Sequence, residues 1–340
     1  MTDVVVNGAF RPQRVTGQQR YATEIANRLL SDHDFDELVP DGRWAGSAAK
    51  EWAWTLGRLP TLARGRTLVS LTSRAPARTP QVLVVHDLFV LTHPEWYSRR
   101  YIATHAPALR AQVRAAAAVV SVSEPAAREV RDRFGVDVRV APNAPSAVFA
   151  AGDAEPDAAV LASLGLRRRG YVLTVGNLEP RKNLSRLARA YGSLPATVRQ
   201  EIPLIVVGGG ASIYRDVDGA WPEGMRAAGY VTDAELASLY RGTLAVAMPS
   251  LAEGFGLPLV EAAAAGAPAL VVSDIPVFRW ICADTAHYVD PHSVESIAEG
   301  LRLAIDGLTP TQAVDLRRFD WDASASVVAQ AALDCTARAR

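Results

Sequence analysis

The sequence is poor in lysine and cysteine. Only Lys50 and Lys182 carry an ammonium group, whereas 34 of the 340 residues are arginine. The two cysteines, Cys282 and Cys335, are too few for a disulfide framework or a cysteine-based metal cluster. We interpret them as ordinary core thiols. A reducing compartment, the cytoplasm, is therefore the expected location.

Long apolar runs and metal-binding patterns are also missing. No run approaches the roughly 18 residues of a membrane span. The chain opens on the strand-like "DVVVNG" rather than on a basic region followed by an apolar one, so we expect no export by that route. Histidine and cysteine do not cluster at metal-ligand spacing, and the acidic stretch at 32–37 is interpreted as a polar turn. We expect no metal and no cofactor.

The length and the charge distribution suggest two parts. A chain of 340 residues with 49% hydrophobic content exceeds the roughly 250 to 300 residues at which single cores stop growing. Residues 1–150 contain 19 basic and 14 acidic residues, whereas 151–340 contain 17 and 22. The basic excess is concentrated in 58–114, where nine arginines accompany only Asp87 and Glu95. An anionic partner is one explanation, and solvated arginines are the other.

Strand-like runs alternate with helical patterns from end to end, which is typical of α/β folds. The first series has strands at 4–6, 82–85 and 119–122 and helices at about 18–30 and 99–117. After a polar linker near residue 150, the second has strands at 171–175, 202–207, 244–248 and 269–272 and helices at about 184–191, at 233–241 and after Pro258. We predict two doubly wound, Rossmann-like domains, 1–150 and 151–320, with a C-terminal helix at about 322–338 that packs back on the first.

Ligands of open α/β sheets bind beyond the carboxyl ends of the strands, and two carboxylates flank such a position. Glu253 lies in a turn after a strand, and Glu261 lies eight positions later on a helix that has Pro258 in its first turn. The backbone amides of Phe255, Gly256 and Leu257 lie at the N-terminus of this helix. Because unpaired N–H groups and the macrodipole favour an anion there, we predict a phosphate between the two carboxylates.

The segment "GNLEPRKN" follows another strand. Gly176 and Asn177 allow a turn, and Arg181 and Lys182 precede the next helix. Cations at a helix N-terminus oppose the macrodipole, so a bound phosphate explains them better than a surface role does. The lysine in an arginine-rich chain indicates that a compact ammonium is needed there. A pair of surface cations is the alternative.

Two further segments of the second half carry weaker signals. The glycines 208–210 let the backbone approach a ligand or form a tight turn, and they do not match the dinucleotide fingerprint. In "GYVTDAEL", Thr232 or Asp233 is expected to cap a helix, and Tyr230 and Val231 to line a base.

The first half offers Gly17, between a strand and a helix, and His86, at the end of a strand. His86 is placed to orient a sugar or to stabilise charge near its reactive carbon. A structural histidine is the alternative reading of the same position.

Taken together, "EGFGLPLVE", "GNLEPRKN", "GYVTDAEL" and "DTAHYVDP" (284–291) resemble glycosyltransferase family 4, the retaining group 1 enzymes of GT-B fold. "TGQQRY" and "HDLFVLTHPEWYS" are similar to the first-domain pattern of members that build bacterial surface polysaccharides. The resemblance covers nearly the whole chain. It implies two domains that face each other across a cleft and a nucleotide sugar bound largely by the second.

The resemblance implies roles for four side chains of the second domain. Glu261 would hold the ribose hydroxyls, Lys182 and Arg181 the diphosphate, and Glu253 the sugar near the reacting centre. The amides after Glu253 would complete the phosphate site. Asn177 departs from the family, because many members have arginine or another residue there, so Lys182 would hold the diphosphate chiefly.

The resemblance also implies roles in the first domain. His86 would face the sugar and act in catalysis together with Glu253 and Lys182. Gly17 would let a loop approach the donor phosphates or the acceptor.

The expected function is the retaining, metal-independent transfer of a hexose or deoxyhexose, such as mannose or rhamnose. The expected donor is a GDP-sugar, and the expected acceptor is a saccharide or lipid-linked saccharide of bacterial surface polysaccharide synthesis, with no nucleic acid involved. The helix at 99–117 carries Arg99, Arg100, Arg110 and Arg114, which suggests peripheral attachment to the inner face of the membrane. The alternatives are a non-catalytic nucleotide-sugar-binding regulator and, disfavoured by the missing fingerprint, a dinucleotide-dependent oxidoreductase.

Overall fold

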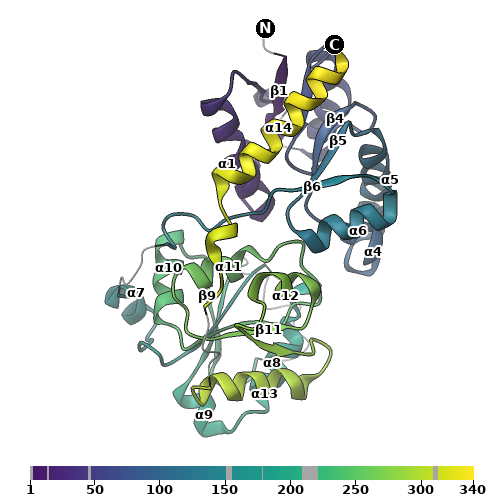
Figure 1. The fold of residues 1–340 in the computed structure, drawn as a ribbon. Coiled ribbons are helices and arrows are strands. Elements are labelled where there is room, and N and C mark those ends of the chain that lie inside the picture. Colours follow the sequence, from purple (N-terminus) through teal and green to yellow (C-terminus); the bar gives the residue numbers. More distant parts are fainter. Residues whose placement is uncertain are drawn as a thin grey trace. The chain divides into compact units, whose positions relative to one another are not determined.

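The computed structural model describes residues 3–13, 15–44, 47–150, 155–177, 179–208, 221–308 and 313–340. The chain divides into two compact units, Met1–Asn143 with Phe319–Arg340, and Ala144–Arg318. Each unit contains a six-stranded sheet whose strands all pair in parallel (Figure 1). This confirms the predicted α/β class with two Rossmann-like sheets. None of the described helices is both long enough and apolar enough to cross a bilayer.

The sheet of the first unit has the strand order β2-β1-β3-β4-β5-β6. Its strands are β1 (Val4–Asn7), β2 (Asp36–Leu38), β3 (Thr67–Ser70), β4 (Gln81–Val85), β5 (Ala118–Ser121) and β6 (Val138–Val140). Its helices are α1 (Gly17–Asp32), α2 (Ala48–Ala53), α3 (Leu59–Leu62), α4 (Phe89–Thr92), α5 (Arg99–Ala115), α6 (Glu124–Phe134) and α14 (Trp321–Ala339). The central strands are buried valine-rich runs, as expected for a parallel sheet covered on both faces.

The C-terminal helix α14 packs on the first unit, against α1 and strands β3 to β5 (Figure 1, yellow). Ser324 donates a hydrogen bond of 2.7 Å to the Pro142 carbonyl, and Asp334 accepts one of 2.6 Å from Arg139. Val328 and Ala332 are fully buried. Residues Phe319–Arg340 therefore complete the core of the first unit. In the sequence, the whole second unit lies between them and the rest of the first unit.

The sheet of the second unit has the order β12-β11-β10-β7-β8-β9. Its strands are β7 (Val172–Val175), β8 (Leu204–Val207), β9 (Met225–Gly229), β10 (Ala245–Met248), β11 (Leu270–Ser273) and β12 (His287–Val289). Its helices are α7 (Ala158–Ser163), α8 (Leu184–Gly192), α9 (Ala196–Glu201), α10 (Asp233–Gly242), α11 (Leu257–Ala264), α12 (Pro276–Cys282) and α13 (Val294–Ile305). Because β10 pairs in parallel with β7, the loops that follow these two strands lie side by side.

The second unit begins earlier in the chain than the predicted boundary at residue 150. Phe149 is buried against the ring of Tyr240 at 5.9 Å, and Arg241 donates a hydrogen bond of 3.0 Å to the Val148 carbonyl. An aromatic anchor thus holds this segment on α10, ahead of the polar stretch that was interpreted as the linker. Residues 151–154 of that stretch lie outside the described residues.

Candidate functional site

A short 3-10 turn, Pro180–Lys182, joins β7 to α8 and ends at Asn183, whose φ of 60° is left-handed. Asparagine tolerates this conformation better than most residues do. The Asn183 amide is buried and donates hydrogen bonds to the Pro249 carbonyl at 2.8 Å and to the Pro291 carbonyl at 2.7 Å. The turn is therefore tied to the loops after β10 and β12.

This turn and the loop after β10 hold one negative and two positive side chains in contact. The Glu253 side chain is only 5% exposed, and its carboxylate lies 2.5 Å from Arg181 Nη1 and 2.6 Å from Lys182 Nζ. The Ser250 hydroxyl donates a further hydrogen bond of 2.9 Å to Glu253 Oε1. The structure thus brings together three of the predicted site residues, at the carboxyl ends of neighbouring strands.

The charge states of this cluster follow from its contacts. Burial alone would raise the pKa of Glu253, but Arg181, Lys182 and the hydrogen bonds outweigh it and lower this pKa to about 2. Burial lowers the pKa of Lys182, and the Glu253 charge opposes that shift. A carboxylate with such a low pKa is ionised at neutral pH, so Glu253 balances the two cations that sequence reasoning assigned to a phosphate alone.

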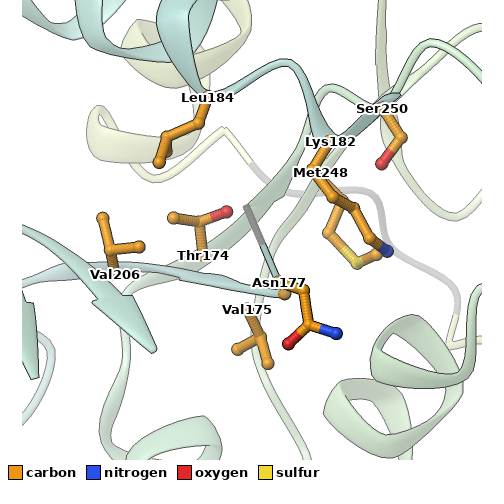
Figure 2. Close-up of a pocket in the computed structure, with 9 residues that line it drawn as sticks. Thr174, Val175, Asn177, Lys182, Leu184, Val206, Met248 and Ser250 are labelled. Atoms are coloured by element: carbon orange, nitrogen blue, oxygen red, sulfur yellow. The ribbon is translucent and has the colours of Figure 1, made fainter. Parts of the chain in front are cut away.

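A small cavity opens beside Lys182 at the ends of β7, β8 and β10 (Figure 2). It is lined by Thr174, Val175, Gly176, Asn177, Lys182, Leu184, Val206, Met248 and Ser250. Gly208 has a φ of 110°, and a Cβ there would lie 2.6 Å from the Gly176 carbonyl oxygen. This close approach explains the first glycine of the triplet, whereas Gly209 and Gly210 lie outside the described residues.

The helix α11 follows the Glu253 loop, with Pro258 in its first turn as predicted. It begins after Gly256, whose φ is 94° and where a Cβ would lie 2.8 Å from the Phe278 ring. Only glycine fits both constraints, so the backbone of Phe255, Gly256 and Leu257 turns sharply into the helix. Glu261 lies one turn into α11 and is 4% exposed. A carboxylate buried this deeply is a candidate binding group.

Of the two residues predicted to cap α10, Thr232 or Asp233, Thr232 is the cap. Its hydroxyl accepts from the Glu235 amide at 3.3 Å, and the Glu235 carboxylate accepts from the Thr232 amide at 2.7 Å, which completes a capping box. Tyr230 is 63% exposed, and it precedes half-buried Val231 in the loop after β9. Lining a base stays a prediction for both residues.

In the first unit, His86 is buried at the end of β4. Its Nε2 lies 2.9 Å from the Leu71 carbonyl, which can only accept, so the proton is on Nε2 and Nδ1 keeps a lone pair. Burial lowers the pKa of His86 to about 4, so the ring is neutral at physiological pH. Tyr21 packs edge-on against it at 5.1 Å between ring centroids. His86 is thus a neutral ring that donates from Nε2 and can accept a hydrogen bond only at Nδ1.

Gly17 is the first residue of α1 and is exposed. A Cβ at this position would meet no atom of the described residues within 4 Å. Packing therefore does not explain the glycine, and the proposed approach to a ligand stays a prediction.

The expected basic patch is smaller in the structure than in the sequence. Arg66 forms an ion pair with Asp36, and Arg74 pairs with Glu51 at 3.1 Å, so acids from outside 58–114 neutralise both. The exposed arginines of α5 are Arg99, Arg100, Arg110 and Arg114. Arg58, Arg64 and Arg78 of the same stretch are exposed as well, so seven of its nine arginines remain on the surface.

Sequence reasoning missed Asn183 and Ser250 in the second unit and an aromatic group around His86 in the first. The aromatic group consists of Trp52, Tyr97, Tyr101 and His105. A signal for three of its members was present, because residues 97, 101 and 105 repeat at the i, i+4 spacing of one helix face.

The described residues contain no group of three or more acidic, histidine or cysteine side chains arranged to hold a metal ion. The positive charge of the candidate site comes from Arg181 and Lys182.

Comparison with known families decides the affiliation. The model described as Glycosyltransferase Family 4 matches residues 15–144, and the one described as Glycosyl transferases group 1 matches residues 162–313. The chain belongs to the group 1, family 4 glycosyltransferases. The two matched segments correspond to the two sheets described above.

Individual relatives of this glycosyltransferase share part of its length. It is 29% identical over 234 residues to the O-antigen chain mannosyltransferase B of Escherichia coli, covering 64% of this chain and 59% of that protein. It is 32% identical over 227 residues to the phosphatidyl-myo-inositol mannosyltransferase of Mycobacterium tuberculosis, covering 62% and 57%. The chain therefore matches a little over half the length of each relative.

Solved structures show the same fold. The Anabaena protein HepE in complex with UDP-glucose is 17% identical, with a TM-score of 0.64 over 99% of this chain and 98% of that one. The predicted GT-B architecture is thereby confirmed at the level of the fold of the two domains.

Proposed function

We propose that this glycosyltransferase transfers a hexose or deoxyhexose from a nucleoside-diphosphate sugar to a saccharide, with retention of configuration. The observation that carries the proposal is the buried cluster of Arg181, Lys182 and Glu253 beside the start of α11. It places fixed cations and helix amides where an α/β sheet binds its ligand.

The chemistry of sugar transfer matches this cluster. Breaking the bond to the anomeric carbon develops negative charge on the leaving diphosphate and positive charge on the sugar. Lys182 and Arg181 would stabilise the diphosphate, and the Glu253 carboxylate would face the sugar. Because these cations are held in place before the donor binds, little reorganisation is needed, and we propose that no metal ion takes part.

The remaining predicted residues would orient the donor. Glu261 would accept hydrogen bonds from the ribose hydroxyls, and Tyr230 and Val231 would line the base. Asn177 lines the cavity beside Lys182, where it would contact the diphosphate. In the first unit, neutral His86 would accept a hydrogen bond from the transferred sugar, and the start of α1 at Gly17 would approach the phosphates or the acceptor.

For the donor, we propose a GDP-linked sugar with mannose as the first candidate, since two relatives are mannosyltransferases by name. The complex of HepE with UDP-glucose makes uridine the main competitor. A saccharide or lipid-linked saccharide of the bacterial surface is the proposed acceptor. We propose that the enzyme acts at the cytoplasmic face of the membrane, with helix α5 facing the lipid.

A thermal-shift screen with GDP, UDP, ADP and dTDP and their sugars tests the proposal. We expect one nucleotide family to raise the melting temperature, because a ligand of the folded state stabilises it by mass action. Transfer or slow hydrolysis of the selected sugar nucleotide, measured with EDTA present, should follow. A protein that binds no nucleotide, or that is active only with added Mg²⁺ or Mn²⁺, would contradict the proposal.

A further inference from the structure

The turn that leads into α11 packs against the helix α12. A Cβ at Gly256 would lie 2.8 Å from the Phe278 ring and 3.5 Å from the Ile281 side chain, and both of these residues belong to α12. Phe255 is 5% exposed, and its ring meets the Trp280 ring edge-on, at 6.1 Å between centroids and 72° between planes. The position of the backbone amides at this turn therefore depends on where α12 lies.

Arg318 holds the carboxyl end of α12. The last carbonyls of a helix have no partner within the helix, and a basic side chain can bind them. The Arg318 guanidinium donates hydrogen bonds to the Ile281 carbonyl at 2.9 Å and to the Trp280 carbonyl. Its positive charge is also favoured there, because the carboxyl end of a helix is the negative end of its dipole. Arg318 thus caps a helix from which it is distant in the sequence.

The same guanidinium lies over the indole of Trp280, at 4.9 Å from the ring centroid. A cation in this position is attracted by the electrons of the aromatic ring. The three side chains of Arg318, Trp280 and Phe255 therefore contact one another in turn, and we call them the Trp280 stack. Its members come from three segments, namely the turn before α11, the helix α12 and the 3-10 turn Leu316–Arg318, which itself lies against α11.

The Trp280 stack begins at the point where the chain leaves the second unit. Arg318 is the last residue of that unit, and the next residue, Phe319, is buried and belongs to the first unit. The segment that returns to the first unit therefore starts from the residue that caps α12 and stacks on Trp280.

We propose that Trp280 and Arg318 are positioning residues, which hold the backbone amides at the start of α11 in place for the phosphates of the donor. They act through Phe255 and through the end of α12, and this role rests on the proposed function, which places the diphosphate at these amides. A group that is fixed before binding adds more to affinity than one that must be ordered on binding. Loss of either side chain should therefore weaken the interaction with the phosphates and spare that with the nucleoside.

Binding of GDP and of guanosine to the full chain tests this division, with UDP and uridine in their place if the thermal-shift screen selects uridine. Calorimetry should show that Trp280→Ala weakens GDP binding about tenfold and guanosine binding less than about twofold. Trp280→Phe keeps an aromatic ring against Phe255 and should restore most of the loss. Equal losses for the nucleotide and the nucleoside, which a general disturbance of the unit would cause, overturn the proposal.

Arg318 should give the same pattern with a different rescue. Arg318→Ala should weaken GDP binding and spare guanosine binding. Arg318→Lys should restore the affinity only in part, because an ammonium lacks the planar fork that binds two carbonyls and stacks on a ring. Unchanged GDP binding in Arg318→Ala would remove this residue from the proposal.

Arg279→Ala is the matched control on the same helix. Arg279 lies 3.5 Å over the Tyr288 ring and pairs with Asp274 at 2.6 Å. Its loss therefore removes a cation–ring contact and an ion pair from α12 but leaves the Trp280 stack intact, so GDP binding should not change. A loss equal to that of Trp280→Ala would show that any disturbance of α12 has this effect, and it would overturn the assignment.

Hydrogen exchange without any ligand separates this inference from the proposed function. The Leu259 amide donates a hydrogen bond of 2.9 Å to the Gly256 carbonyl, so its exchange reports on the turn. We expect faster exchange in Trp280→Ala and Arg318→Ala than in the wild type and in Arg279→Ala. Faster exchange in a chain that binds no sugar nucleotide would contradict the proposed function and support the role of the Trp280 stack. Unchanged exchange and unchanged GDP binding in both variants of a chain that transfers sugar would do the reverse.

Discussion

The candidate sites of the two units use opposite kinds of chemistry. In the second unit, the buried Glu253 carboxylate lies within 2.6 Å of both Arg181 and Lys182. In the first unit, a neutral imidazole lies beside stacked aromatic rings. The described part of the second unit thus gathers charged side chains at the carboxyl ends of its strands, whereas the first unit gathers aromatic rings around a neutral histidine.

The largest effect is expected at Lys182. Lys182→Ala should lower transfer on the order of 10² fold or more, because it removes a fixed charge from the leaving group. Lys182→Arg should not restore full activity, since a guanidinium differs in shape from the compact ammonium. Steady-state kinetics measures both, with Arg302→Ala as the control, an exposed cation paired with Glu299 and Asp306. Near-wild-type transfer by Lys182→Ala would remove this lysine from the site.

The two glutamates of the second unit should separate binding from turnover. Glu253→Gln keeps the shape and should mainly lower kcat, since Glu253 is proposed to act at the reacting sugar. Glu261→Ala should mainly raise KM and weaken nucleotide binding, because a ribose contact contributes equally before and during the reaction. Kinetics and nucleotide titration of both variants decide. Parallel changes of kcat and KM in the two variants would contradict this division.

The two sites should respond to acid in different pH ranges. The pKa of His86 is about 4 in the folded chain and about 6.5 when unfolded, so only the unfolded state gains this proton as the pH falls from 6.5 to 4. Stability should drop by about 3 kcal/mol over this range. Glu253, with a folded pKa of about 2, stabilises the fold above pH 4.5 and loses this contribution only as the pH falls from 4.5 to 2.

Urea unfolding at a series of pH values measures this difference. His86→Gln should reduce the loss between pH 6.5 and 4 and leave the lower range intact. His292→Gln, at an exposed histidine of the second unit, is the control and should change neither range. Identical acid profiles for wild type and His86→Gln would show that His86 protonates freely in the folded state.

The smallest effect concerns the surface of α5. Each exposed cation near an anionic leaflet contributes roughly 1 kcal/mol, so Arg99, Arg100, Arg110 and Arg114 should support reversible, salt-sensitive attachment. Co-sedimentation with phosphatidylserine vesicles at low and high salt tests this. Alanine at all four positions should abolish binding at low salt. Binding that is unchanged in this variant, or absent in the wild type, would leave α5 facing water or a soluble partner.

The site of the second unit was more predictable from the sequence than that of the first. Lys182 and Glu253 are 71 positions apart, but each follows a recognisable buried strand, and ligand-binding loops gather at that edge. Their direct ion pair could not be predicted, because it depends on the pairing of β7 with β10 and on the bonds of Asn183 to two distant loops.

In the first unit the interactions are less local. Trp52 contacts His105 of α5 from a different helix, so no short motif contains the whole aromatic group around His86. The strand β2 was also missed. A polar turn was predicted over 32–37, but its last two residues, Asp36 and Glu37, belong to this strand. β2 has only three residues, Asp36–Leu38, and lies at the edge of the sheet with none of them buried, so it lacks the apolar run of the central strands.

The return of α14 to the first unit has a consequence for synthesis of the protein. A ribosome that has made residues up to Asn143 must add the whole second unit before Phe319–Arg340 appear. At ordinary elongation rates this interval lasts roughly 9 to 35 seconds. During it, the apolar surface that Val328 and Ala332 later cover is exposed on the nascent chain. The second unit, whose residues are contiguous, is therefore expected to reach its final packing first and the first unit to depend more on chaperones.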